Sequence, residues 1–96
     1  MKVQLDIGSQ FPEITGEQAD AFAEELMKVE DGDYTEVVLD FDGTELISSM
    51  ALGSLFSAHM KLSEQGRSLR LVNVGEKVTR LLSMVGLSHL TGSVEG

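Results

Sequence analysis

Hydrophobic and polar residues alternate with two different periods along this chain. In residues 2–8, KVQLDIG, every second side chain is apolar, which is typical of a half-buried strand. Residues 15–30 repeat apolar side chains at intervals of three and four, which indicates a one-sided helix with Thr15 as its predicted N-cap. The apolar run at residues 35–41, TEVVLDF, predicts a second strand that is more fully buried than the first.

The second half of the chain continues this alternation. A helix is predicted to begin at Ser48 or Ser49 and to end at Gly66, with one apolar stripe formed by Leu52, Leu55, Phe56 and His59. Residues 68–74 predict a strand. Residues 76–86 predict a third helix that ends at Gly86. Its inward-facing residues are expected to be Val78, Leu81, Leu82 and Val85.

Strands that alternate with helices predict an α/β fold. We expect a small open mixed β-sheet of about four strands, largely parallel in its later strands, with all three helices packed against it. The expected core consists of Phe22, Leu26, Val38, Leu39, Leu55, Phe56, Leu69, Leu71, Leu81 and Leu82.

Composition sets limits on what this fold can do. The chain has 96 residues, 42% of them hydrophobic, so we expect a single domain over residues 1–90 and a C-terminal tail over residues 91–96. Because cysteine is absent, disulfides, thiolate metal sites and cysteine nucleophiles are excluded. No apolar run suits a signal peptide or a membrane-spanning segment, which leads us to expect a soluble cytoplasmic protein without membrane insertion.

The net charge of −9 is unevenly distributed. Residues 1–45 hold thirteen acidic and two basic residues, whereas residues 46–96 hold three acidic and five basic residues. This excess of negative charge disfavours direct binding to nucleic acid, because it repels phosphates. The acidic half is expected to keep the protein soluble, and steering toward a basic partner is a second interpretation.

One motif suggests catalysis. The segment VVLDFDGT resembles the nucleophile motif of haloacid dehalogenase-like phosphohydrolases, in which the first aspartate attacks a phosphoryl group. Here Asp40 and Asp42 would fill the two aspartate positions. Such chemistry needs Mg²⁺ and further carboxylates, yet no aspartate follows Asp42 and the later glutamates are scattered. We therefore expect a strand-end aspartate and a turn aspartate before Gly43, no metal site, no cofactor and no enzyme.

A second resemblance covers residues 37–87. The segments VVLDF, DGTEL, ISSMALG, SEQGRSLRLVNV and VTRLLSMVGL follow one another as in the STAS domain of bacterial anti-sigma factor antagonists and sulfate transporters. The resemblance implies a signalling module that binds an anti-sigma factor or a serine kinase-like protein in a partner-switching system of transcription regulation. The alternative is a non-switching STAS subunit of a larger sensory or lipid-transport complex.

The resemblance also indicates a binding site. The family sequence Ile-Asp-Ser-Ser-Gly-Leu-Gly matches residues 47–53 without gaps, and Met50 replaces the second serine, which antagonists phosphorylate. We therefore expect no phosphorylation at the usual position and regard Ser49 as the alternative site. The expected partner-binding residues are Ser48, Ser49, Met50, Ala51, Gly53 and Ser54. For the two serines, simple capping of the helix is the competing interpretation.

Three remaining features complete the expectations. His59 and His89 have no catalytic partner at a defined spacing, so we expect structural or surface roles for both. The segment NVGEKV lacks the glycine spacing of a phosphate loop and predicts a turn from strand to helix. STAS domains usually begin with a two-strand hairpin, but this chain has only KVQLDIG there, so we expect a missing strand or a different sheet edge.

Overall fold

The computed structural model describes residues 1–87 and Leu90. His89 and the predicted tail at residues 91–96 lie outside the described residues. Within the described part, no helix combines the length and the apolar content that a membrane crossing requires. The elements in chain order are β1 (Lys2–Asp6), α1 (Ile7–Gln10), β2 (Glu13–Ile14), α2 (Glu17–Glu30), β3 (Glu36–Asp40), β4 (Leu46–Ile47), α3 (Ser49–Glu64), β5 (Ser68–Val72) and α4 (Glu76–Met84).

The strands form two small parallel sheets. The larger has the order β1-β3-β5, in which Val3 pairs with Val37 and Val37 with Leu69. The smaller consists of β2 and β4, which pair Glu13 with Leu46 and Ile14 with Ile47. The α/β class and the packing of helices on a small sheet are confirmed. The expected mixed sheet is instead parallel throughout and divided into two parts, because the crossover helices return the chain in the same direction each time.

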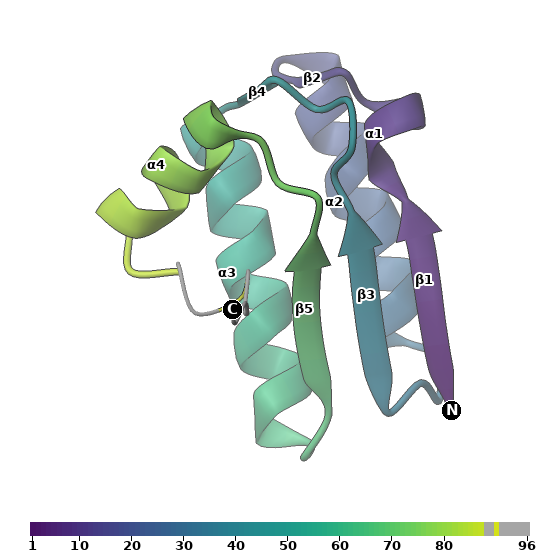
Figure 1. Cartoon of the computed structure of the whole chain (residues 1–96). Helices are drawn as coiled ribbons and strands as arrows, with labels where there is room; N and C mark the ends of the chain where they lie inside the picture. Colours follow the sequence, from purple (N-terminus) through teal and green to yellow (C-terminus); the bar gives the residue numbers. More distant parts are fainter. Residues whose placement is uncertain (88–89, 91–96) are drawn as a thin grey trace.

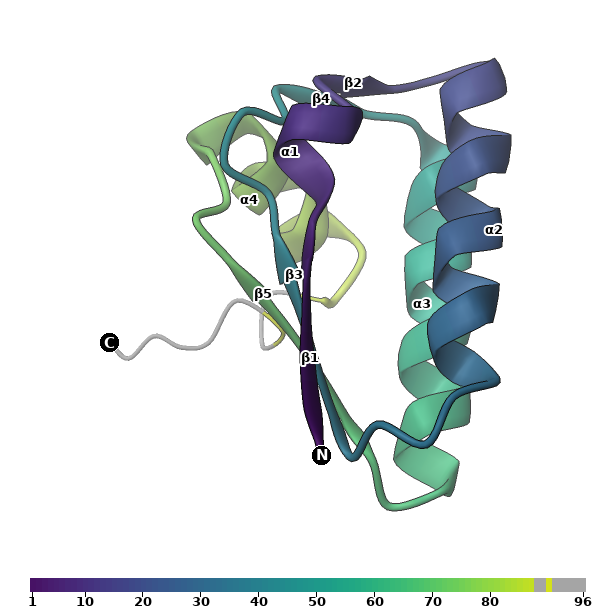
Figure 2. The same cartoon turned by 90° about the vertical axis from the view of Figure 1, so that its right-hand side faces the viewer.

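Two of the three predicted helices cover the larger sheet. Figures 1 and 2 show α2 and α3 side by side on one face of β1, β3 and β5, with no described element packed over the opposite face. The third helix, α4, packs against β4 and lies beside the end of β5, which corrects the expectation that all three helices lie on the sheet. The reason is local: Asn73 adopts a positive φ of 56° directly after β5 and turns the chain aside.

The core lies between this sheet and the helices α2 and α3. Val37, Leu39 and Leu71 of the sheet are completely buried, as are Phe22 and Leu55 of the helices. Phe22 also makes edge-to-face contacts with Phe11 and Phe41, at centroid distances of 6.0 and 6.2 Å. Eight of the ten predicted core residues are buried. Phe56 is 48% exposed and Leu81 is only partly buried, so these two predictions are wrong.

The face of the sheet opposite α2 and α3 is mostly polar. Gln4, Val38 and Arg70 are register partners in one row on this face. Val38 is buried without belonging to the core cluster, since the longer side chains of Gln4 and Arg70 flank it.

Two predicted helix and strand boundaries at the start of the chain are corrected. The first strand ends at Asp6 because its carboxylate accepts hydrogen bonds from the amide and hydroxyl of Ser9 and so caps the short helix α1. Ile7 therefore belongs to α1 instead of continuing the strand. The N-cap of α2 is Gly16, with φ 54° and no side-chain cap, so the predicted cap at Thr15 is wrong.

Candidate functional site

The start of α3 is held in place by its own cap and by the small sheet. Ser48 is the N-cap, and its hydroxyl accepts a hydrogen bond of 3.2 Å from the amide of Ala51. The amide of Ser48 donates to the carbonyl of Ile14 at 2.9 Å, continuing the pairing of β2 with β4. Because Ile14 and Ile47 are both buried, the loop that presents Ser49 and Met50 rests on a packed base.

The expected partner-binding residues divide by exposure. Ser49, Met50 and Gly53 are exposed and Ser54 is partly exposed, so these four share the outer surface of the first turns of α3. Ser48 is also partly exposed, although its hydroxyl is engaged in the cap. Ala51 is completely buried and belongs to the core cluster, so its side chain lies away from this outer surface.

An apolar groove of about 320 Å³ runs beside these residues. Its lining comes from α3 and from the residues that follow α4: Ser49, Leu52, Gly53, Phe56, Val85 and Leu87. The sequence pattern predicts that Phe56 and Val85 face inward, but Val85 is 50% exposed and, like Phe56, contributes to the groove. Gly86, with φ 80°, ends α4 as predicted and turns Leu87 back into the core.

Large exposed apolar side chains extend the groove into a patch. Met50, which directly follows the groove residue Ser49, is 63% exposed, and Met60 and Met84 are also among the exposed hydrophobic residues of α3 and α4. On the outer side of α3, Met50, Gly53, Phe56 and Met60 recur at intervals of three or four residues and so follow one helical stripe. The helix is therefore apolar on its outer side as well as toward the core. We call Met50, Phe56, Val85 and the groove between α3 and α4 the α3–α4 patch.

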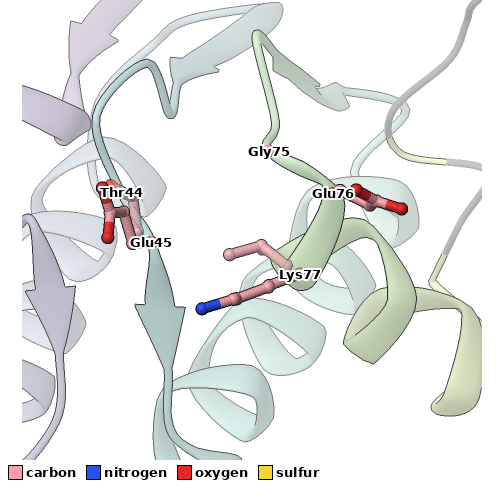
Figure 3. A pocket seen from close by; sticks show the side chains of 6 residues that line it. Thr44, Glu45, Gly75, Glu76 and Lys77 are labelled. Atoms are coloured by element: carbon pink, nitrogen blue, oxygen red, sulfur yellow. The ribbon is translucent and has the colours of Figure 1, made fainter.

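A second hollow lies where the chain passes from β5 into α4. It is lined by Thr44, Glu45, Gly75, Glu76, Lys77 and Val78. Figure 3 shows Lys77 extending toward Thr44 and Glu45, while Glu76 points away. The hydroxyl of Thr44 donates to the carbonyl of Phe11, and Glu76 pairs with Arg80 at 3.1 Å, so both groups are engaged elsewhere. The predicted strand-to-helix turn in NVGEKV is confirmed, with Gly75 as N-cap.

The two aspartates of the phosphohydrolase-like motif have structural roles. Asp40 is the last residue of β3, and its Oδ1 accepts hydrogen bonds from the amide of Asp42 and from the side-chain amide of Asn73. Asp42 and Gly43 form the turn that the hydrogen bond from Thr44 N–H to the Phe41 carbonyl closes. The predicted strand-end and turn positions are confirmed. Within the described residues, no three His, Cys, Asp or Glu side chains are arranged to hold a metal ion.

One of the two histidines lies on α3. His59 is half-buried, between the core stripe and the outer stripe of the helix. The second histidine, His89, lies outside the described residues.

Comparison with known proteins assigns the chain to a family. The family model of the STAS domain matches residues 11–94, so the chain belongs to the STAS domain family. Among solved structures, the chain is similar to the anti-sigma factor antagonist SpoIIAA in its unphosphorylated form. The TM-score is 0.77 at 17% sequence identity, and the match covers 98% of this chain and 81% of that one. A search of curated proteins found no significant match.

The sequence pattern predicts a candidate site at the start of α3 but misses the apolar groove beside it. The serines and Met50 are identified because the family motif aligns there without gaps. Phe56 and Val85 are predicted to lie in the core, because both are apolar and lie next to a buried stripe of their helix. The sequence spacing is the same whether such a residue faces a sheet or solvent. The signal for the outer stripe lies in the spacing of Met50, Phe56 and Met60.

Proposed function

We propose that this chain is a protein-binding regulatory STAS domain that resembles an anti-sigma factor antagonist and binds an anti-sigma factor of the serine-kinase type. The contact surface consists of Ser48, Ser49, Met50, Gly53 and Ser54, together with the α3–α4 patch. The exposure of Met50, one residue after Ser49 of the apolar groove, is the observation that carries the proposal. Contiguous exposed apolar surface is typical of protein-binding sites, and methionine adapts its shape to a partner. In this proposal, residues 1–90 act as a single domain in the cytoplasm.

The proposed regulator is not phosphorylated at the usual position. Met50 occupies the place of the phosphoserine of antagonists and offers no hydroxyl. Ser49 is exposed and is the alternative acceptor, but one residue of helix rotates a side chain by about 100°. A docked kinase that reaches position 50 would therefore find Ser49 pointing elsewhere. The contact surface stays uncharged, and partner binding is constitutive.

Mass spectrometry tests this part of the proposal. The wild type, Ser49→Ala and Met50→Ser are incubated with a candidate anti-sigma factor kinase and ATP. We expect no phosphate on the wild type and one phosphate on Met50→Ser, because that substitution restores the family's acceptor. Phosphate on wild-type Ser49 that disappears in Ser49→Ala would establish the alternative site. Phosphate on Ser48, or outside residues 47–54, would contradict the proposed surface.

Binding provides the companion test. Met50→Asp places a charge where an apolar contact is proposed, so it should weaken the complex with the candidate kinase by roughly tenfold or more, which corresponds to about 1.4 kcal/mol. Gln4→Asp is the control, because it adds the same charge at an exposed position on β1, whereas α3 lies at the β5 side of the sheet. Calorimetry should show unchanged affinity for the control. Equal losses in both variants, or none in either, would contradict the assignment of the surface.

A permanent subunit of a sensory or lipid-transport complex is the second candidate. The uncharged acceptor position favours it, since an interface without a phosphorylation switch suits a constant assembly. The two candidates differ in how readily the chain exchanges its partner. A partner-switching regulator leaves one partner for another, whereas a permanent subunit stays bound to one partner after dilution and in the presence of ATP. Measuring the dissociation rate of the native complex separates them.

A further inference from the structure

The outer edge of β1 is unpaired within the described residues. In the sheet order β1-β3-β5, β1 is a terminal strand, and Figure 1 shows no described element beyond it. The carbonyl of Met1 accepts a hydrogen bond from the amide of Glu36, which begins the parallel ladder with β3. Because alternate residues of a strand direct their backbone groups to opposite sides, Lys2, Gln4 and Asp6 direct theirs to the outer edge. Such an edge is a template for another strand.

The apolar face of the sheet continues to this edge without full cover. Val3 and Leu5 face the same side as the buried core and pack against it, but both are only partly buried. Their register partners on β3, Val37 and Leu39, are completely buried. An additional strand beside β1 would bury the remaining apolar surface of Val3 and Leu5.

The sequence of β1 is complementary to itself when reversed. If two copies of KVQLD pair antiparallel about Gln4, Lys2 lies opposite Asp6 and Val3 lies opposite Leu5, each pair occurring twice. This register also places the outward-directed backbone groups of Lys2, Gln4 and Asp6 opposite one another. In the described residues Lys2 belongs to none of the four ion pairs. The Asp6 carboxylate accepts from Ser9, and the Asp6 carbonyl accepts from the side-chain amide of Gln10 at 3.0 Å. Carboxylate and carbonyl oxygens can each accept a further bond.

From this complementarity we propose that two copies of the chain pair through the edges of β1, antiparallel about a two-fold axis at Gln4. The pairing joins the two three-stranded sheets into one continuous sheet. It covers Val3 and Leu5 and places Lys2 of each copy opposite Asp6 of the other.

The other edge of the sheet does not have this complementarity. The same operation on β5, SLRLV, is centred on Arg70 and would place two arginines opposite each other. Like charges directly opposite one another are destabilising, so the charge pattern selects β1. The family match begins at residue 11 and does not include β1, and α3 lies at the β5 side of the sheet. The pairing therefore leaves both copies of the α3–α4 patch accessible and is independent of the proposed function.

Engineered cysteines test the register directly. The chain has no cysteine, so Gln4→Cys introduces a single thiol at the proposed axis. Residues opposite each other in a hydrogen-bonded antiparallel pair have Cα atoms about 5.5 Å apart, within the range of a disulfide. Under mild oxidation Gln4→Cys should form a covalent dimer rapidly. Arg70→Cys, an exposed position in the same row of the sheet, is the matched control and should remain largely monomeric. Equal rates for both variants would overturn the proposal.

Sedimentation of the unmodified chain provides a second test. The wild type should associate, with increasing concentration, to twice the 10.4 kDa mass of one chain. Lys2→Glu places like charges opposite each other twice and should weaken association roughly tenfold. Lys28→Glu makes the same change of net charge on α2 and should leave association unchanged, with circular dichroism verifying that both variants fold. A wild type that stays monomeric at every concentration, or equal effects of the two variants, would overturn the proposal.

Discussion

At the scale of single residues, Gly8 shows how closely two backbone segments meet. A Cβ atom at Gly8 would lie 1.7 Å from the carbonyl oxygen of Asp42, far inside any permitted contact. Gly43 adopts φ 105° in the facing turn, and its own Cβ position is 3.3 Å from the carbonyl oxygen of Gly8. The short helix α1 therefore rests directly on the turn that follows β3, with no side chain between them.

This contact predicts the effect of adding one methyl group. Gly8→Ala should lower the free energy of unfolding by about 1–3 kcal/mol or more, because the obstructing atom is backbone and cannot rotate away. Gly53→Ala is the control: its Cβ would meet nothing within 4 Å among the described residues, and alanine favours a helix interior by about 1 kcal/mol. Urea unfolding measures both changes. A Gly8→Ala variant as stable as the wild type would contradict the placement of α1.

At the scale of secondary-structure elements, Arg67 joins three of them. Its guanidinium donates to the carbonyls of Val29, Glu30 and Tyr34, at distances of 2.9, 3.1 and 2.6 Å. The first two carbonyls belong to the last turn of α2, where the Val29 carbonyl also accepts from the amide of Gly32, and the third belongs to the segment that leads into β3. One side chain at the start of β5 thus caps a helix far away in sequence.

Replacing Arg67 should weaken the attachment of α2 to the start of β5. We expect Arg67→Ala to reduce the free energy of unfolding by roughly 2–4 kcal/mol, since it leaves partly buried carbonyls without a charged donor. Arg67→Lys should recover only part of the loss, because a single ammonium group cannot span three carbonyls. Amide hydrogen exchange should show faster opening at the end of α2. Protection unchanged in both variants would exclude this role.

Adjacent residues of α3 distinguish its two sides. Leu55 is completely buried, so Leu55→Ala should cost roughly 2–5 kcal/mol of stability. Phe56, the next residue, is largely on the outer side, and Phe56→Ala should cost under about 1 kcal/mol while weakening partner binding. Thermal or urea unfolding compares the two variants. A reversed order of the losses would mean that α3 is rotated relative to the arrangement described above.

At the scale of the whole molecule, the two aspartates of the phosphohydrolase-like motif, Asp40 and Asp42, have structural roles in the fold. Asp40 binds the turn and Asn73, which leaves its carboxylate engaged in holding two loops together. We expect no Mg²⁺-dependent hydrolysis of a small phosphate ester such as para-nitrophenyl phosphate. Asp42→Asn should have no effect on any activity of the protein. Purified protein with and without Mg²⁺ provides the measurement. A turnover that Asp40→Asn abolishes would establish the phosphohydrolase interpretation instead.

The sequence by itself determined the elements that depend on local chemistry. The strand at Glu36–Asp40, the cap of α3 at Ser48 and the ends of α3 and α4 near Gly66 and Gly86 all follow from short patterns, because caps, turn glycines and apolar periodicity act over a few residues. The family motif at residues 47–53 is equally local. The predicted alignment of Met50 with the phosphoserine position rests on this motif alone.

Only the tertiary structure decided which apolar side chains face the core and which form a surface. Phe56 and Val85 fit the same spacing as buried residues, but α4 packs against β4 and leaves them on the outside, an arrangement that depends on the turn at Asn73. The contact of Gly8 with Asp42 and the reach of Arg67 to α2 join residues more than thirty positions apart. Local patterns carry no information about such contacts, because they arise only when separate elements pack together.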